Sequence, residues 1–235
     1  MEHWLSHALF GVLLIMPWQS WKGIRLLDVQ IARDAGARIM FYRSAIFGQW
    51  VLASIALVAM WSVQADSIGD MLTVELSGDA LGIVGLATLA VLSQCALVPP
   101  VHRRMQRSAA ARRAIYPLRN ILPRSAAEKL MWINVALTAG ICEEILFRGF
   151  LILYATEILG LETAGAIAVS SAIFAVGHYY QGLPNMIRVG VVGALLAIVF
   201  VMTDSILLCI ILHAALDLGA LRMGDLVASD NMNES

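Results

Sequence analysis

The sequence has few charged residues: Asp, Glu, Lys and Arg make up 14% of its 235 residues. Soluble domains usually carry about 25% charged residues, so this composition excludes an ordinary soluble protein. Nothing in the formal net charge of −1 indicates nucleic-acid binding. Hydrophobic residues make up 60% of the chain and the mean hydropathy is +0.78, which is typical of a protein with several membrane spans.

Cysteine is also scarce, with only Cys95, Cys142 and Cys209. All three lie in apolar runs and no CxxC pair is present, which excludes the usual cysteine-based metal sites. We expect them to be reduced, buried residues. The given sequence shows no lipidation motif and no internal repeat of 20 to 50 residues, so we expect no repeat architecture.

Apolar runs of about 20 residues, the length that spans a bilayer, recur along the chain. They predict seven helices at residues 4–20, 40–62, 79–98, 129–156, 161–180, 186–202 and 204–221. The first run has no preceding basic region and no A-x-A site, so we expect a retained span and not a signal peptide. The sequence therefore predicts an all-α membrane bundle, a single domain over residues 1–235, whose first and last two helices are short.

Lys and Arg gather in the connections after the first and third spans. They are Lys22, Arg25, Arg33, Arg38, Arg43, Arg103, Arg104, Arg107, Arg112, Arg113, Arg119, Arg124 and Lys129. The connection between these two, residues 62–79, contains neither residue type. By the positive-inside rule the basic connections, with Arg188 and Arg222, are cytoplasmic and the N-terminus is outside. We expect residues 22–39 and 100–128 to lie on the anionic lipids of the inner leaflet as surface helices.

Ionisable residues nevertheless interrupt three of the predicted spans. They are Glu143, Glu144, Arg148, His178, His213 and Asp217. A charged side chain at the bilayer centre costs about 2.5 to 3.5 kcal/mol on insertion scales, so such residues indicate a functional site. Alone, each histidine is explained as a hydrogen-bonded core residue, but their joint occurrence favours a shared catalytic or ligand-binding cluster.

Helix geometry separates the two adjacent glutamates. Glu144 and Arg148 are four residues apart, which predicts an ion pair on one face of the helix. Glu143 is turned by about 100° from Glu144 and is free to face another helix. With a rise of about 1.5 Å per residue, Glu143 and His178 reach a similar depth in the cytoplasmic half of the membrane, which predicts access from the cytoplasm.

The chemistry of this set suits amide hydrolysis. A buried carboxylate beside an imidazole acts as a general base on water. His213 and Asp217, stacked four residues apart at the same level, supply a second imidazole and a carboxyl group that polarise a carbonyl and stabilise an oxyanion.

Three motifs follow one another along the fourth, fifth and seventh predicted helices. They are EExxxR at Glu143, Glu144 and Arg148, FxxxH at Phe174 and His178, and HxxxN/D at His213 and Asp217. In this order and spacing they resemble the CPBP (Abi) family of intramembrane proteases, which includes the type II CAAX prenyl proteases. The resemblance covers the motif-bearing core, residues 129–221.

The resemblance implies a glutamic-type intramembrane endopeptidase with no cofactor that acts on a membrane-associated protein. The size and topology of the chain indicate a prokaryotic plasma membrane. It implies that Glu143 and His178 activate water and that His213 and Asp217 bind the substrate carbonyl or oxyanion. Asp217 stands where the family often has Asn. The remaining motif residues, Glu144, Arg148 and Phe174, would organise the site.

Three alternatives remain open. Glu143, His178 and His213 are a candidate zinc set, although the HExxH motif of zincins is missing. A non-enzymatic membrane binding protein, such as a bacteriocin self-immunity factor, would not need the carboxylate chemistry. A proton-coupled carrier is disfavoured because no inverted repeat is present.

Overall fold

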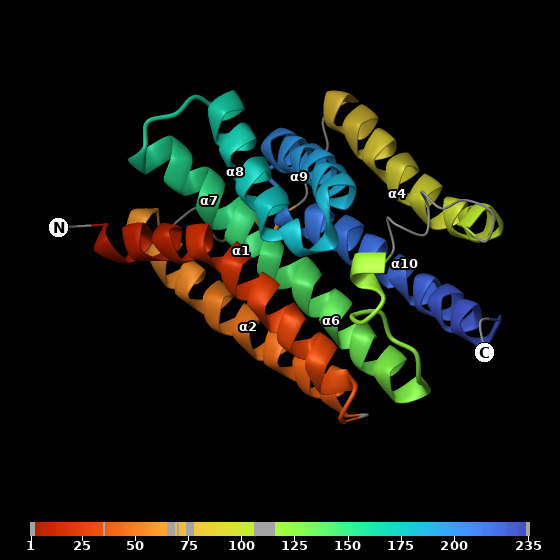
Figure 1. Cartoon of the computed structure of the whole chain (residues 1–235). Helices are drawn as coiled ribbons and strands as arrows, with labels where there is room; N and C mark the ends of the chain where they lie inside the picture. Colours follow the sequence, from red (N-terminus) through yellow and green to blue (C-terminus); the bar gives the residue numbers. More distant parts are fainter. Residues whose placement is uncertain are drawn as a thin grey trace.

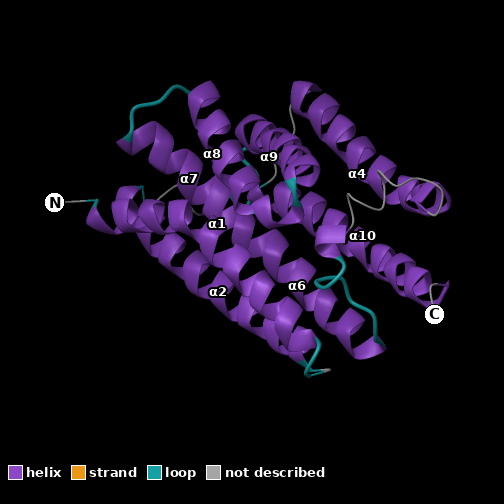
Figure 2. Ribbon diagram, in the orientation of Figure 1, coloured by secondary structure: helices purple, strands orange, loops and turns teal. Residues whose placement is uncertain are grey.

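The computed structural model describes residues 3–34, 36–64, 69, 71–73, 78–105 and 116–233. Within these ranges the protein is all-α, with seven helices and no strand (Figure 2). The helices are α1 (Trp4–Ile31), α2 (Ala37–Val63), α4 (Gly78–Met105), α6 (Ala126–Glu144), α8 (Thr163–Gly177), α9 (Leu183–Thr203) and α10 (Ile206–Asn233). The predicted helical class is therefore confirmed. The side chains of Cys95, Arg103, Arg104 and Arg222 are not described, and Arg107, Arg112 and Arg113 lie outside the described residues.

Two of these helices, α2 and α9, are long and apolar enough to cross a membrane. Three shorter apolar helices are present at Gly78–Leu92, Thr163–Gly177 and Ile206–Leu221. These five apolar segments fit a membrane-embedded chain. The number of spans and their orientation stay predictions.

The predicted helix lengths were wrong at both ends of the chain. The helices α1 and α10 have 28 residues each, whereas short helices were expected. Residues 22–31 do not form a separate surface helix, because they continue α1 and bury Ile24 and Leu27 in the bundle. Of the seven helices named above, α8 is the shortest: it has 15 residues and ends at Gly177.

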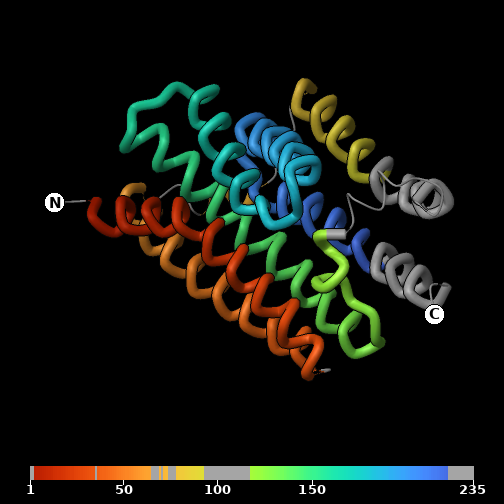
Figure 3. Tube along the Cα trace, viewed as in Figure 1, coloured from red at the N-terminus to blue at the C-terminus, as the bar shows by residue number. Residues whose placement is uncertain are grey.

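Three helices lie side by side at the front of the bundle. Figure 1 shows α1 and α2 antiparallel in red and orange with α6 beside α2, and the traces in Figure 3 follow the same order. On its other side α6 packs against α10, and α10 in turn contacts α4. The central helix α6 therefore carries the EExxxR motif between α2 and α10.

A glycine on α6 allows α10 to approach closely. A Cβ atom added at Gly140 would lie 3.0 Å from the Ala214 Cβ and 3.1 Å from the Ile210 carbonyl oxygen. A side chain at this position would force α6 and α10 apart by a few tenths of an ångström. The approach brings the end of α6, with Glu143 and Glu144, beside His213 on α10.

The start of α6 is held by a buried ion pair. Ser125 and Glu128 form a capping box, and Arg38 of α2 donates from Nη1 to the Glu128 carboxylate over 2.6 Å. Burial raises the pKa of Glu128, but the hydrogen bonds from the Ser125 and Arg124 backbone and from Arg38 outweigh it and hold this pKa below its usual value.

The same arginine fixes the segment that precedes α6. Arg38 Nε donates to the Asn120 carbonyl over 2.9 Å, and the Tyr42 hydroxyl donates to the Ile121 carbonyl. Residues 117–125 are therefore tied to α2, with Ile121 and Leu122 buried. This segment replaces the last part of the predicted surface helix at 100–128.

Candidate active site

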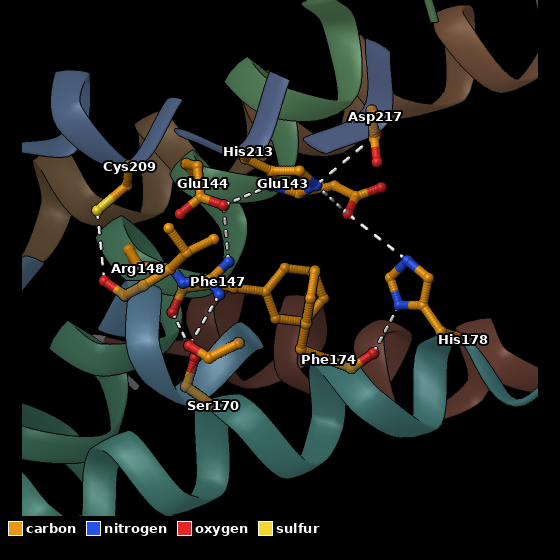
Figure 4. A network of polar contacts seen from close by, with 12 residues as sticks. Glu143, Glu144, Phe147, Arg148, Ser170, Phe174, His178, Cys209, His213 and Asp217 are labelled. Atoms are coloured by element: carbon orange, nitrogen blue, oxygen red, sulfur yellow. Dashed lines mark hydrogen bonds and ion pairs between the residues drawn. The ribbon is translucent and has the colours of Figure 1, made fainter. Parts of the chain in front are cut away.

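The EExxxR motif lies where α6 changes its helical period. After Glu144 the helix continues as a π-helical turn, Ile145–Phe150, and then through α7 (Leu151–Leu153) to Ile158. Such π-turns occur frequently at functional sites. The turn carries Arg148, and Figure 4 shows its side chain beside Glu144.

Glu144 and Arg148 form the predicted ion pair. Arg148 Nη1 donates to Glu144 Oε1 over 2.8 Å, and both side chains are almost fully buried, at 0% and 1% exposure. The same carboxylate oxygen accepts a hydrogen bond from His213 Nδ1 over 2.6 Å. This second contact was not predicted, because it joins helices far apart in the sequence.

Phe174 separates the arginine from the histidines. The Arg148 guanidinium lies 4.7 Å from the centroid of the Phe174 ring, within the range of a cation–π contact. The same ring lies 4.7 Å from the His178 ring and meets the His213 ring edge-on at 5.8 Å. Phe174 thus packs between the charged pair and both imidazoles.

The Phe174 ring packs against the backbone of Gly193 in α9, which has no side chain. A Cβ atom there would come within 2.9 Å of Phe174 Cδ1. The bare backbone instead lets Arg148 Nη2 donate to the Gly193 carbonyl over 3.0 Å. Arg148 therefore joins α9 to the helix that carries both glutamates.

Glu143 points away from the ion pair, as the helix geometry predicted. Its Oε1 accepts a hydrogen bond from Gln49 Nε2 over 2.8 Å. Its Oε2 is buried without a hydrogen-bond partner among the described residues. His178 Nε2 and His213 Nε2 lie 3.9 and 3.8 Å from this oxygen, so two imidazoles face one carboxylate (Figure 4).

The hydrogen bonds of the histidines fix the proton on one nitrogen of each ring. His178, which follows the last residue of α8, has Nδ1 2.8 Å from the Phe174 carbonyl oxygen. A carbonyl only accepts, so this Nδ1 carries a proton and donates. His213 Nδ1 likewise donates to the Glu144 carboxylate. Both Nε2 atoms are left to face Glu143.

Asp217 lies one turn beyond His213 on α10. Its Oδ2 is 3.8 Å from His213 Nε2, which is longer than a hydrogen bond. The side chain is 37% exposed, and the Asp217 carbonyl accepts a hydrogen bond from Trp132 Nε1 over 3.0 Å. The predicted stacking of His213 and Asp217 is present without a direct hydrogen bond.

These polar groups line one large cavity. Its volume is about 740 Å³, and its wall includes residues of α1, α2, α6, α8, α9 and α10. The site residues in the wall are Glu143, Phe174, His178, His213 and Asp217. Leu118, Ile121 and Leu122, from the segment that Arg38 holds, also line it. The structure therefore places the residues of all three motifs around one cavity.

Comparison with protein families agrees with this grouping. Residues 125–219 match the family described as type II CAAX prenyl endopeptidase Rce1-like. This segment is an Rce1-like domain. It begins at the N-cap of α6 and ends two residues after Asp217, so it contains every residue of the three motifs. The Rce1-like family is a family of membrane-embedded proteases. Neither the curated proteins nor the solved structures gave a match.

Gln49 is a site residue that sequence reasoning missed. It lies in α2, outside the Rce1-like domain, and is the residue that holds Glu143 Oε1. The signal in the sequence was an uncharged polar residue in the middle of the 40–62 apolar run. Because the Gln49 side chain is uncharged, it does not stand out among the ionisable residues that indicate a site.

We expect Gln49→Leu to lower kcat by about 10-fold or more with a smaller change in KM, because a hydrogen bond to a charged group contributes about 1.5–3 kcal/mol. Initial rates on any peptide that the wild-type protein cleaves give the two parameters. Gln19→Leu is the matched control, since Gln19 lines the same cavity and no described hydrogen bond joins it to the site. Equal rates for both variants would remove Gln49 from the site.

The candidate zinc set has a wide spacing. A tetrahedral zinc ion with bonds of about 2.0–2.1 Å places its ligand atoms about 3.3 Å apart. Glu143 Oε2 lies 3.8 and 3.9 Å from the two histidine nitrogens, and the described residues contain no group of three metal-ligating side chains at metal-binding distance. Zinc binding would require these side chains to move closer together.

Proposed function

We propose that the Rce1-like domain hydrolyses a peptide bond of a membrane-associated protein with water activated by Glu143 and His178. The observation that carries this proposal is the buried Oε2 of Glu143, which has no hydrogen-bond partner among the described residues. A buried carboxylate oxygen without a hydrogen-bond partner destabilises the fold. Such destabilised ionisable groups occur frequently in catalytic sites.

The spacing supports a water molecule between the three groups. A water about 2.8 Å from Glu143 Oε2 fits between it and the two Nε2 atoms, since hydrogen bonds have this length. Glu143 takes one proton from this water with the help of His178, and the water oxygen attacks the substrate carbonyl carbon. The carbonyl π-electron pair moves to its oxygen and forms the tetrahedral oxyanion.

His213 and Asp217 then face the developing negative charge. A second proton on His213 Nε2 lets this nitrogen donate to the oxyanion, while Glu144 accepts from Nδ1 on the opposite side of the ring. When the intermediate collapses, the C–N bond breaks and the departing amine receives the proton that Glu143 and His178 took from water. The Glu144–Arg148 pair keeps His213 in this orientation.

The direction of access follows from the cavity wall. The wall includes Leu118, Ile121 and Leu122 of the segment before α6 and Tyr180 and Gln181 after α8. The positive-inside rule assigns this end of the bundle to the cytoplasm. We therefore propose a multi-pass membrane protein whose site opens to the cytoplasmic side. The size and topology of the chain favour the plasma membrane of a prokaryotic cell.

A comparison of peptide termini tests this function. Membranes from cells with the wild-type protein and with Glu143→Gln are analysed by mass spectrometry for protein termini that depend on the carboxylate. The proposal expects at least one membrane-associated protein with such a terminus. The self-immunity alternative expects no dependent terminus and full biological activity of the variant.

Chelation separates the glutamic mechanism from the zinc alternative. We expect the purified protein to keep its full cleavage rate after dialysis against a strong chelator, because Glu143 and His178 suffice to activate water. Elemental analysis of the same sample checks that the metal content is far below one ion per protein molecule. Loss of activity that added zinc restores would assign Glu143, His178 and His213 to a metal site.

A further inference from the structure

A second hollow adjoins the catalytic cavity. It is a groove of about 350 Å³ between α4, α9 and α10, lined by aliphatic side chains and by Arg188. Arg188, Val192 and Leu216 line both the groove and the 740 Å³ cavity. The two hollows therefore meet at a wall that contains a guanidinium group.

Arg188 has no partner within the described part of the chain. Within the described residues, its side chain forms no hydrogen bond, ion pair or ring contact. Arg188 is exposed, whereas the buried cations are paired: Arg148 with Glu144 and Arg38 with Glu128. A guanidinium in a largely apolar wall favours a ligand that accepts hydrogen bonds and carries negative charge.

The charges in the cavity confine an anionic group to one part of the wall. Glu143 and Asp217 are the carboxylates of the wall, and Arg188 is its only Lys or Arg among the described residues. A negatively charged group on a bound peptide is repelled by both carboxylates and attracted by Arg188, so beside Arg188 is where the described wall favours it. The position of Arg188 on α9, at the border with the groove, separates this contact from the reacting water.

We propose that Arg188 is a specificity-determining residue that binds a carboxylate of the substrate peptide where the cavity meets the groove. The proposal rests on the proposed hydrolysis of a membrane-associated peptide and names the chemistry of its substrate. The guanidinium donates two parallel hydrogen bonds to the carboxylate. Apolar atoms next to that carboxylate lie against Val192 and Leu216.

Binding of a matched pair of amphiphiles tests the assignment. N-Decanoylglycine carries a carboxylate, and N-decanoylglycinamide differs from it only by an uncharged amide. In nanodiscs of phosphatidylcholine we expect the wild-type protein to bind the acid about 10- to 100-fold more tightly than the amide, the range for a hydrogen bond to a charged group. Arg188→Gln removes this difference, and Arg188→Lys, which keeps the charge without the planar fork, retains part of it.

Arg43→Gln is the control, since it also removes one positive charge from an exposed side chain but Arg43 lines neither hollow. Equal binding of acid and amide by the wild type, or a preference that survives in Arg188→Gln, would overturn the proposal. Tighter binding of a third probe, decyl phosphate, that is lost in Arg188→Gln would assign Arg188 to a lipid headgroup instead. Binding is measured without turnover, so this test does not depend on cleavage. A protein that cleaves no peptide would refute the proposed function, but the binding result would still test the role of Arg188.

Discussion

Glu143→Gln lowers kcat by about 10²- to 10⁴-fold, the contribution of a positioned general base. The amide keeps the size of the side chain, and its oxygen still accepts the hydrogen bond that Gln49 donates over 2.8 Å. It cannot take a proton from water between the two imidazoles. Initial rates with purified protein in nanodiscs measure the loss, and we expect His178→Ala to behave alike.

The control for this prediction is Glu157, which lies on the continuation of α6. Glu157 is exposed, and Glu157→Gln removes one carboxylate without touching the cavity, so its rate should equal that of the wild type. Thermal unfolding of each variant checks that the fold persists. A Glu143→Gln protein that unfolds normally and retains more than a third of the wild-type rate would exclude Glu143 as the base.

Arg148→Met destabilises the protein by about 3–5 kcal/mol, the effect of removing one partner of a buried ion pair. Glu144 would keep its charge at 0% exposure and lose the 2.8 Å hydrogen bond from Arg148. The Gly193 carbonyl would lose its donor as well. Thermal unfolding in detergent, followed by size-exclusion chromatography, measures the loss. An unchanged midpoint would show that the pair does not stabilise the fold.

A double variant separates charge from packing. Glu144→Gln combined with Arg148→Met removes both charges, and the glutamine oxygen still accepts the hydrogen bond from His213 Nδ1. We expect the double variant to be more stable than Arg148→Met alone, since no uncompensated charge stays buried. Arg43→Met, a change on an exposed arginine of α2, serves as the control and should unfold like the wild type.

Local contacts of the site could be predicted from spacing. The Glu144–Arg148 pair and the stacking of His213 with Asp217 join residues four apart on one helix, so the helical period alone places them together. The rotation between adjacent residues likewise separated Glu143 from Glu144. Approximate depths predicted that Glu143 and His178 reach a similar level, and in the structure His178 Nε2 lies 3.9 Å from Glu143 Oε2.

Contacts between helices far apart in the sequence could not be predicted in this way. The hydrogen bond from Gln49 to Glu143 and that from His213 to Glu144 depend on how closely α2 and α10 approach α6. That approach is set by side-chain packing at positions such as Gly140, where the Ala214 Cβ lies 3.0 Å from an added Cβ. The extension of α1 to Ile31 also depended on packing, because Ile24 and Leu27 are buried by neighbouring segments.

By itself, the sequence determined an all-α, apolar chain in which three of the helices carry motifs with ionisable residues. These properties follow from composition and from residue spacing, which act within a single helix. Only the tertiary structure decided that both histidines face the same oxygen of Glu143, that Gln49 holds the other oxygen, and that Arg188 borders two hollows. Each of these depends on distances between helices, which are fixed when the whole bundle packs.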